Sequence, residues 1–472
     1  MTNDILVRGG YVLTMDHEIG DLPVGDVLLS GDRIVEVAPS IHAPDAEIVD
    51  AAGMIVLPGI IDGHRHVWQS LLRGLASDWT FPAYMIEARA MYAGCFDAED
   101  AYVANLIGGL ESIQGGVTTV VDHSHLQASP EISDALARGL KDSGVGGIFC
   151  YGLQNAPSYI DGAPIDADAV KDLLTRSPDP WHDENAARIR DTHFMTGPLS
   201  FGVALPEATP YMPAEFAAAI LARATALSPR LVTGHWNAIS RPDVYVSTLS
   251  DLVGRNAFSI PTLLSHNNNL NEADLKVMAS VGLGLCTCPD IECGMGIGPL
   301  MARRFVELGG AASLGLDLSA FVQADMFKQA RVLLQIERKL LAEETGHMSA
   351  EIGYPTRAVL ELLTLTGARS LGMDDEIGSL TPGKRADLIV VAPAPLVNAA
   401  SSDPVAALIF HTDASDVDTV IVAGHVRKRA AGLQGVDHDD LAQRSRRSVA
   451  AIRERYSRLP RETLTGVWAD MF

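Results

Sequence analysis

Cysteine is scarce in this chain, with 5 among 472 residues, too few for the disulfide framework of a small secreted protein. Long apolar runs are also missing, because none approaches the roughly 18 residues that a membrane-spanning helix needs. The first residues show no basic stretch followed by a long apolar one, so we expect no signal peptide. These absences predict a cytoplasmic protein that does not bind a membrane.

Positive charge is in short supply. The chain has 36 Lys and Arg against 59 Asp and Glu, which gives a formal net charge of −23. Such an excess of negative charge argues against nucleic acid and anionic membrane surfaces as partners. It does not argue against a small-molecule substrate, because the local field governs a pocket. With 47% hydrophobic residues, the chain can bury the core of one large domain and a smaller one.

The order of predicted elements divides the chain into three parts. Residues 1–56 and 378–430 are rich in short β-runs and turn glycines, and we expect both to form one small β-sandwich domain. Between 57 and 377, eight strand-like runs alternate with helical stretches, which predicts an α/β fold of the (β/α)8 TIM-like barrel type; an open doubly wound sheet is the alternative. Residues 431–472 are predicted to form a helical tail that clasps the barrel or a second subunit.

The expected barrel elements can be placed along the chain. The first strand ends near residue 61. The other seven cover 118–122, 147–151, 201–205, 231–235, 262–266, 282–286 and 312–317. Helical stretches are expected at 98–114, 214–227, 272–281, 323–345, 355–371 and 438–457. The segment 152–198 is long for one connection and contains several prolines, so we expect an insertion that partly covers the site.

Two histidines stand at the end of the first barrel strand. The apolar runs 54–57 and 60–61 predict a strand buried on both faces. Alternate residues of a strand share a face, so His64 and His66 point the same way. Two imidazoles on one face can occupy two corners of a divalent metal site, and a pair of solvated loop histidines is the alternative.

Further polar residues end later strands. His235 ends the fifth strand, His266 the sixth and Asp317 the eighth. Catalytic groups of (β/α)8 barrels lie at the C-terminal ends of the strands, so these side chains should converge with His64 and His66. Three histidines and one aspartate can hold one zinc-like ion and leave a coordination position for water.

Several segments carry a resemblance to a known family. They are Pro58-Gly59-x-x-Asp62-x-His64-x-His66 and the stretches 116–122, 314–317, 366–369 and 378–388. In these segments the chain resembles the amidohydrolase superfamily, and within it the branch of atrazine chlorohydrolase, cytosine deaminase and guanine deaminase. The resemblance extends over nearly the whole chain.

The resemblance implies a role for each strand-end residue. His64, His66, His235 and Asp317 would bind one divalent metal ion, with zinc as the first choice and iron, cobalt or manganese as alternatives. Such an ion lowers the pKa of its water from about 16 to about 7. His266 would polarise the bond under attack, and Asp317 would carry the proton to the leaving group. The strand 201–205 contains no lysine, so no second metal held by a carboxylated lysine is expected. The resemblance also implies a homo-oligomer.

One departure bears on the reaction. Ring deaminases of this branch usually carry His-x-x-Glu after the fifth strand, and the Glu protonates the ring nitrogen, whereas here Ala238 follows His235 at that spacing. Asp290 or Glu292 could replace the acid. Hydrolysis of an acyclic C–N bond needs less acid assistance. The sequence therefore favours attack of metal-bound hydroxide on a small amide, urea or (thio)carbamate, as in the phenylurea and molinate-type thiocarbamate hydrolases, to which the pattern is similar.

Two other functions stay open. A deaminase or dechlorinase of a purine, pyrimidine or triazine ring is favoured by Gln69, which stands where a substrate-contacting Gln is found in this branch. A catalytically inactive barrel used for assembly is disfavoured, because all four metal ligands are present.

Residues near the strand ends are predicted to contact the substrate, since aromatic rings can stack on a planar substrate and polar groups can orient it. For Trp68, packing under a loop is an equal alternative; His123 and His125 could instead support the metal ligands. The predicted substrate residues are Trp68, Gln69, His125, Trp236, Asn237, Asn267, Asp290 and Glu292.

Overall fold

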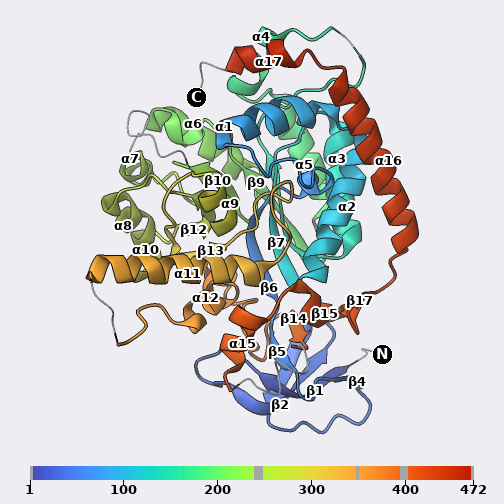
Figure 1. Ribbon diagram of the computed structural model, residues 1–472, viewed down its shortest axis with the longest axis vertical. Helices are drawn as coiled ribbons and strands as arrows, with labels where there is room; N and C mark the ends of the chain where they lie inside the picture. Colours follow the sequence, from blue (N-terminus) through green and yellow to red (C-terminus); the bar gives the residue numbers. More distant parts are fainter. Residues whose placement is uncertain (1–3, 163, 239–247, 347–349, 394–401, 469–472) are drawn as a thin grey trace.

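Two sheets organise the computed structural model, which describes residues 4–162, 164–238, 248–346, 350–393 and 402–468 (Figure 1). The first is a parallel sheet of eight strands in the order of the sequence. A bridge between Arg65 and Asp317 joins its two ends and nearly closes a barrel. The predicted (β/α)8 barrel is thereby confirmed. The strands are β6 (Ile60–Arg65), β7 (Val117–Ser124), β8 (Gly146–Gly152), β9 (Leu199–Ala204), β10 (Val232–Trp236), β11 (Thr262–His266), β12 (Gly284–Thr287) and β13 (Ala311–Leu314).

The barrel strands are buried because helices cover their outer faces. Every residue of β7 and β8 is buried, as expected for a parallel sheet covered on both sides. The helix α2 (Ala98–Gln114) occupies the predicted range, and it begins at Asp97, whose carboxylate accepts from the Asp100 amide in a capping box. The other large covering helices are α3 (Pro130–Ser143), α6 (Ala214–Ala226), α8 (Glu272–Ser280) and α11 (Met326–Thr345).

The helical stretch expected at 355–371 is instead two helices, α12 (Thr356–Leu362) and α13 (Leu365–Ser370). Thr364 between them has a non-helical backbone, with φ −133° and ψ −105°. The carbonyl of Leu363 accepts a hydrogen bond from the Ile61 amide at 2.9 Å. That carbonyl therefore serves the first barrel strand rather than a continuing helix.

The second sheet is built from both ends of the chain (Figure 1). Its nine strands run in the order β17-β16-β15-β14-β5-β1-β2-β3, with β4 paired to β1. The junction is the antiparallel pair β5 (Ile55–Pro58) and β14 (Leu388–Val391), and β5 leads directly into β6. This mixed sheet has its own apolar cluster. Its other strands are β1 (Ile5–Val12), β2 (Leu22–Ser30), β3 (Arg33–Ala38), β4 (Glu47–Asp50), β15 (Val417–Val422), β16 (His425–Arg429) and β17 (Gly432–Leu433).

The C-terminal tail lies along the barrel. Helix α16 (His438–Ser457), which covers the predicted range, packs beside α2, and α17 (Arg461–Trp468) continues to the top of the view near α4 (Ala167–Thr175) (Figure 1). Arg455 in α16 pairs with Asp97 at 2.6 Å and with Asp100 at 2.5 Å. Within the chain, the tail thus clasps the barrel.

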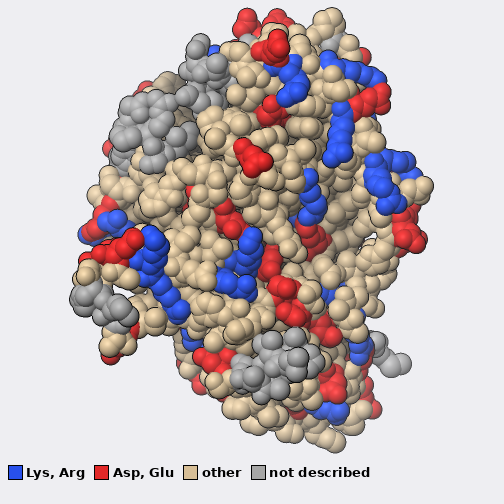
Figure 2. Space-filling model, viewed as in Figure 1, with Lys and Arg blue, Asp and Glu red and all other residues tan. Residues whose placement is uncertain are grey.

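The surface carries both charge signs. On the face shown in Figure 2, basic groups lie next to acidic ones instead of gathering in one continuous patch. Among the described residues, no helix combines the length and apolar character that crossing a bilayer demands.

Candidate metal centre and active site

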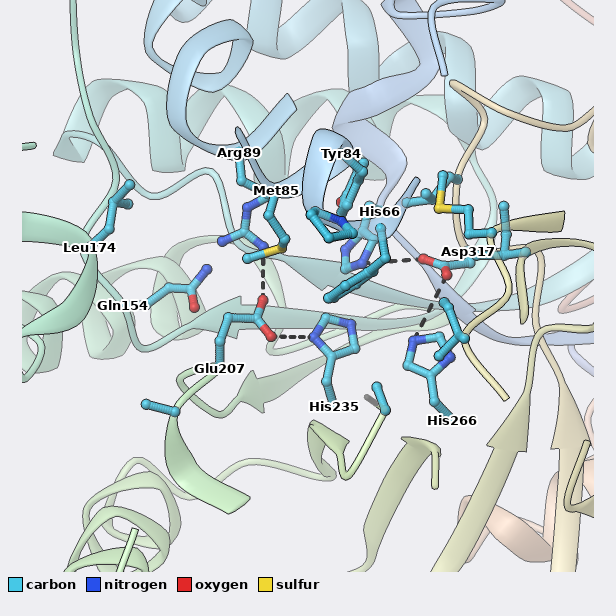
Figure 3. A pocket seen from close by; sticks show the side chains of 18 of the residues that line it. His66, Tyr84, Met85, Arg89, Gln154, Leu174, Glu207, His235, His266 and Asp317 are labelled. Carbon is cyan, nitrogen blue, oxygen red and sulfur yellow. Dashed lines mark hydrogen bonds and ion pairs between the residues drawn. The ribbon is translucent and has the colours of Figure 1, made fainter. Parts of the chain in front are cut away.

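Five polar side chains meet at the C-terminal end of the barrel, namely His64, His66, His235, His266 and Asp317. Figure 3 shows the last four of them. The Nε2 atoms of His64 and His235 are 3.0 Å apart, although these residues end β6 and β10. The Asp317 Oδ1 lies 3.3 Å from His66 Nε2 and 3.6 Å from His64 Nε2. The Oδ2 of the same carboxylate lies 3.8 Å from His266 Nε2. The structure therefore brings together all five residues that the strand-end argument selected.

The backbone at these strand ends is unusual. His266 and Asp317 have φ of 73° and 65°, in the left-handed region that residues with a Cβ seldom adopt. Asp317 is held there by two bonds to the first strand, from its amide to the His64 carbonyl at 2.8 Å and from the His66 amide to its carbonyl at 3.0 Å. Such backbone strain clusters at functional sites, where the surrounding structure fixes it.

The partners of the outer ring nitrogens fix the tautomer of two of these histidines. His66 Nδ1 lies 2.8 Å from the His123 carbonyl, and His235 Nδ1 lies 2.6 Å from the Glu207 carboxylate. Carbonyls and carboxylates only accept, so both Nδ1 atoms carry the proton and both Nε2 lone pairs face inward. His64 Nδ1 pairs with the Ser265 hydroxyl at 3.0 Å, a group that can accept or donate, and its Nε2 faces His235 Nε2 at 3.0 Å.

Inward-facing lone pairs at these spacings fit a divalent metal ion. Ligand atoms about 2.0–2.2 Å from one zinc ion lie about 3–3.6 Å apart. The pairs His64–His235, His66–Asp317 and His64–Asp317 have separations in this range. Burial, followed by the neighbouring histidines, lowers the pKa of His64 and His66 well below the ordinary value. The neutral imidazole that results is the form that binds metals. Burial raises the pKa of Asp317 to about 6, against the lowering effect of His266 and His235.

His266 has a carboxylate partner behind it. Its Nδ1 lies 3.1 Å from Glu292 Oε1, which also accepts from the Cys288 amide at 2.8 Å. The other Glu292 oxygen accepts from the Asn268 amide group at 3.1 Å. Burial alone would lower the pKa of His266, but the bond to Glu292 and the charge of Asp317 outweigh it and raise the pKa. Glu292 therefore orients His266 from the side away from the cavity.

A cavity of about 550 Å³ opens above these groups. Its floor is polar, with His66, His235, His266 and Asp317, and its walls are mostly apolar (Figure 3). The insertion 152–198 contributes part of the wall, as expected from its length. The apolar lining consists of Phe81, Pro82, Tyr84, Met85, Leu174, Ala208, Tyr211, Ala238, Ile291, Met295, Ile297 and Leu318.

The eight predicted substrate residues do not line this cavity, because they are held in the layer behind it. Trp68 is buried and donates from Nε1 to His125 Nδ1 at 3.0 Å. It therefore packs inside the protein, as the alternative prediction for this residue had it, and does not line the cavity. Gln69 donates to the hydroxyl of Tyr84 at 2.7 Å, and thus supports a residue that does line the wall.

The other members of that set are engaged elsewhere. Asn267 donates to the Leu264 carbonyl at 2.8 Å, and Asp290 pairs with Lys328 at 3.0 Å on α11. Trp236 ends β10, Asn237 follows it, and both are buried, while Glu292 lies behind His266. Strand ends alone do not tell which side chains turn toward the cavity.

Two charged residues of the cavity were missed by the sequence argument, Arg89 and Glu207. Arg89 Nη1 donates to Glu207 Oε1 at 2.8 Å, and Glu207 Oε2 accepts from His235. Burial would raise the pKa of Glu207, but the facing His235 and Arg89 hold it well below its usual range. Glu207 follows the expected strand 201–205 by two residues, a placement that could have identified it. Arg89 lies in the π-helix η2 (Met85–Met91), for which the sequence offers no comparable signal.

Comparison with known sequences identifies the family of this chain. The sequence model described as "Amidohydrolase family" matches residues 55–427. The chain is 26% identical over 470 residues to the 5-methylthioadenosine/S-adenosylhomocysteine deaminase of Desulforudis audaxviator, covering 95% of this chain and 99% of that one. It is 24% identical over 454 residues to the 5'-deoxyadenosine deaminase of Methanosarcina mazei, covering 95% and 98%.

Solved structures show the same fold. An adenosine deaminase from Xanthomonas campestris with bound zinc superposes with a TM-score of 0.79 at 21% identity, covering 96% of this chain and 99% of that one. The atrazine chlorohydrolase of Arthrobacter aurescens, in complex with zinc, superposes with a TM-score of 0.78 at 20% identity, covering 94% and 100%.

Proposed function

The chain belongs to the amidohydrolase family and is a hydrolase acting on C–N bonds, and we propose that it is a metal-dependent deaminase of an amino-substituted aromatic ring, with an adenine that carries an apolar substituent as the model substrate. The relatives named above are deaminases of adenosine compounds according to their names, and they align over almost the whole chain. They favour this reaction over hydrolysis of an acyclic amide, urea or carbamate, which the sequence alone favoured.

One observation carries the proposal. A cavity of about 550 Å³ with mostly apolar walls has a polar floor, which includes the proposed metal ligands His66, His235 and Asp317. Ligand pockets for small molecules have volumes of about 300–1,000 Å³. A flat heteroaromatic ring with an apolar substituent suits such walls, while its amino-bearing carbon can approach the floor. A strongly charged substrate would lose much of its hydration against these apolar walls.

The metal would be held by His64, His66, His235 and Asp317. Bound there, a divalent ion, with zinc as the first candidate, supplies hydroxide at neutral pH by lowering the pKa of its water. The ligand set suits zinc, iron, cobalt and manganese, so metal loading belongs in every assay.

Two side chains of this site can assist the reaction, one by proton transfer and one by stabilising charge. The Asp317 carboxylate lies between the inward-facing Nε2 atoms and His266, with its Oδ2 3.8 Å from His266 Nε2. It can therefore receive a proton released by the attacking water and pass it to the departing amine. His266, held by Glu292, faces the substrate from the other side and stabilises negative charge that develops on the ring. The bond between the ring carbon and its exocyclic amino group breaks, a C–O bond forms at that carbon and ammonia leaves.

Hydrolysis of an acyclic C–N bond is the second candidate, and Ala238 is the observation that favours it. Its methyl group lines the cavity where ring deaminases of this branch carry an acid. Glu207 also lines the cavity, but Arg89 and His235 engage both of its oxygens. An ionised carboxylate in two such bonds is poorly suited to donate a proton to a ring nitrogen.

A product assay separates the two candidates. Metal-loaded protein would be incubated with 5'-methylthioadenosine, 5'-deoxyadenosine, adenosine, aminotriazines, aryl ureas, anilides and thiocarbamates, and the products identified by mass. Replacement of a ring amino group by oxygen, with release of ammonia, is the expected result. Release of an aryl or alkyl amine from the acyclic compounds, with the rings untouched, would establish the second candidate instead.

A further inference from the structure

We propose that Glu207 is a positioning residue that fixes His235 as a metal ligand and that Arg89 anchors Glu207. The inference rests on the metal centre of the proposed function, but not on the identity of the substrate. It follows from the chain of contacts Arg89–Glu207–His235 at the cavity wall, in which each bond is shown in Figure 3.

His235 needs such a partner more than the other ligands do. Its side chain is 15% exposed, against 0% for His64 and 2% for His66. A neutral imidazole can carry its proton on either nitrogen, and only one tautomer leaves Nε2 free for a metal. The 2.6 Å bond from Nδ1 to Glu207 selects that tautomer and turns Nε2 toward His64 Nε2.

The outer partners of the three rings differ in kind. The His66 ring is held by a backbone carbonyl of β7, and the His64 ring by the Ser265 hydroxyl of β11. Both partners belong to rigid barrel strands. Glu207 instead follows β9, and its side chain must itself be fixed before it can orient a ring.

Arg89 supplies that second restraint. It donates to the Glu207 oxygen that does not contact His235, so the carboxylate cannot rotate without breaking one of two charge-assisted bonds. Arg89 is 8% exposed and comes from η2, which forms part of the cavity wall. On the same helix, Glu87 is bound by the Tyr456 hydroxyl and by Arg461 at 3.5 Å. The C-terminal tail is thereby connected to the metal ligand through the cavity wall.

Glu207 could act differently, as a ligand of a second metal ion. His123, Glu207 and His235 offer ligand atoms within 4.8 Å of one another, and both ring nitrogens of buried His123 have no hydrogen-bond partner. The guanidinium of Arg89, however, already contacts Glu207 and would repel a second cation at that place. Metal stoichiometry distinguishes the two roles.

The test measures metal affinity rather than turnover. Wild type, Glu207→Gln, Glu207→Ala and Arg89→Met would be stripped of metal, and the dissociation constant for Zn²⁺ measured by competition with a chromophoric chelator, together with the number of ions bound. Loss of an outer partner of a metal-binding histidine weakens binding about 10–100-fold. We expect a loss of this size in Glu207→Ala and smaller losses in Glu207→Gln and Arg89→Met. Glu207→Gln weakens binding less because its carbonyl oxygen can still accept from Nδ1.

Glu376→Gln is the matched control, because Glu376 also pairs with an arginine, Arg230 at 2.6 Å, but contacts no histidine of the site. It should bind zinc as the wild type does. Thermal unfolding of the metal-free proteins shows whether each variant folds, and the isosteric Glu207→Gln keeps the test valid if Glu207→Ala does not fold. Wild-type affinity in both Glu207 variants would overturn the proposal, as would two ions in the wild type with one lost on substitution. Weaker binding supports it even if no ring is deaminated.

Discussion

The Asp317 amide donates a hydrogen bond to the His64 carbonyl over 2.8 Å, although the two residues lie at opposite ends of the barrel sequence. This bond closes the barrel between its first and last strands and sets the Asp317 carboxylate beside the His64 and His66 rings. Closure of the fold and assembly of the site are therefore the same structural event. A substitution that removes a ligand side chain leaves this backbone bond in place.

We therefore expect Asp317→Asn and His64→Ala to abolish turnover without unfolding the protein. A loss of at least about a thousandfold in kcat, or about 4 kcal/mol of transition-state stabilisation, is expected because both metal binding and proton transfer fail. Steady-state kinetics, circular dichroism and bound-metal content test this. Full activity with wild-type metal content in either variant would contradict the assignment of the ligands.

Ala238 offers a gain-of-function test. Placing an acid there by Ala238→Glu should raise kcat/KM for ring deamination about tenfold, since general acids contribute about 10²–10⁴-fold when ideally placed. Ala238→Gln has nearly the same size but cannot donate a proton as a carboxylic acid does, so it is the matched control. Equal effects of the two variants would show that pocket shape, not acidity, limits the reaction.

Asp122 should make stability depend on pH. Burial raises its pKa to about 7 from the ordinary 3.8, despite the bonds from the Val67 amide and Asn105. The folded state therefore holds the proton of Asp122 more tightly than the unfolded state does. The contribution of this group to the free energy of unfolding is complete below pH 4 and is lost as pH rises toward 7. Each pH unit in this window removes at most about 1.4 kcal/mol.

The Asp122→Asn variant should flatten this dependence, because Asn cannot ionise. Urea unfolding of the metal-free protein at several pH values between 4 and 7 measures it, with wild type as reference. An unchanged slope in Asp122→Asn would assign the pH dependence to other buried groups, such as Asp62, whose pKa burial raises to about 6.

The sequence predicted the barrel and the convergence of the strand-end residues, because both depend on local signals. Apolar runs marked the buried strands, and a polar residue at the end of a strand, such as His235 or His266, pointed to the mouth of the barrel. The cavity wall was not predictable in this way. Arg89 reaches it from a π-helix, and Trp68 turns away from it to bond His125. Which way such side chains turn depends on packing between segments far apart in the sequence.

The tail should control the cavity wall. Helix α17 packs against both η2 and α4, and each of these carries residues that line the cavity, among them Met85 and Leu174. Leu464 of α17 is fully buried. Removing residues 461–472 would expose its partners and release the Arg461–Glu87 contact, so η2 should become more mobile.

We expect this truncation to raise KM severalfold while kcat changes less, because binding depends on the wall and the chemistry on the barrel floor. Arg458→Ala is the control, since Arg458 pairs with Glu454 of its own helix on the exposed surface. Kinetics of both variants on the substrate identified by the product assay test this. An unchanged KM in the truncated protein would mean that the wall holds its shape without the tail. An equal fall of kcat and kcat/KM would instead indicate that the tail acts on the metal centre, through Glu87, Arg89 and Glu207.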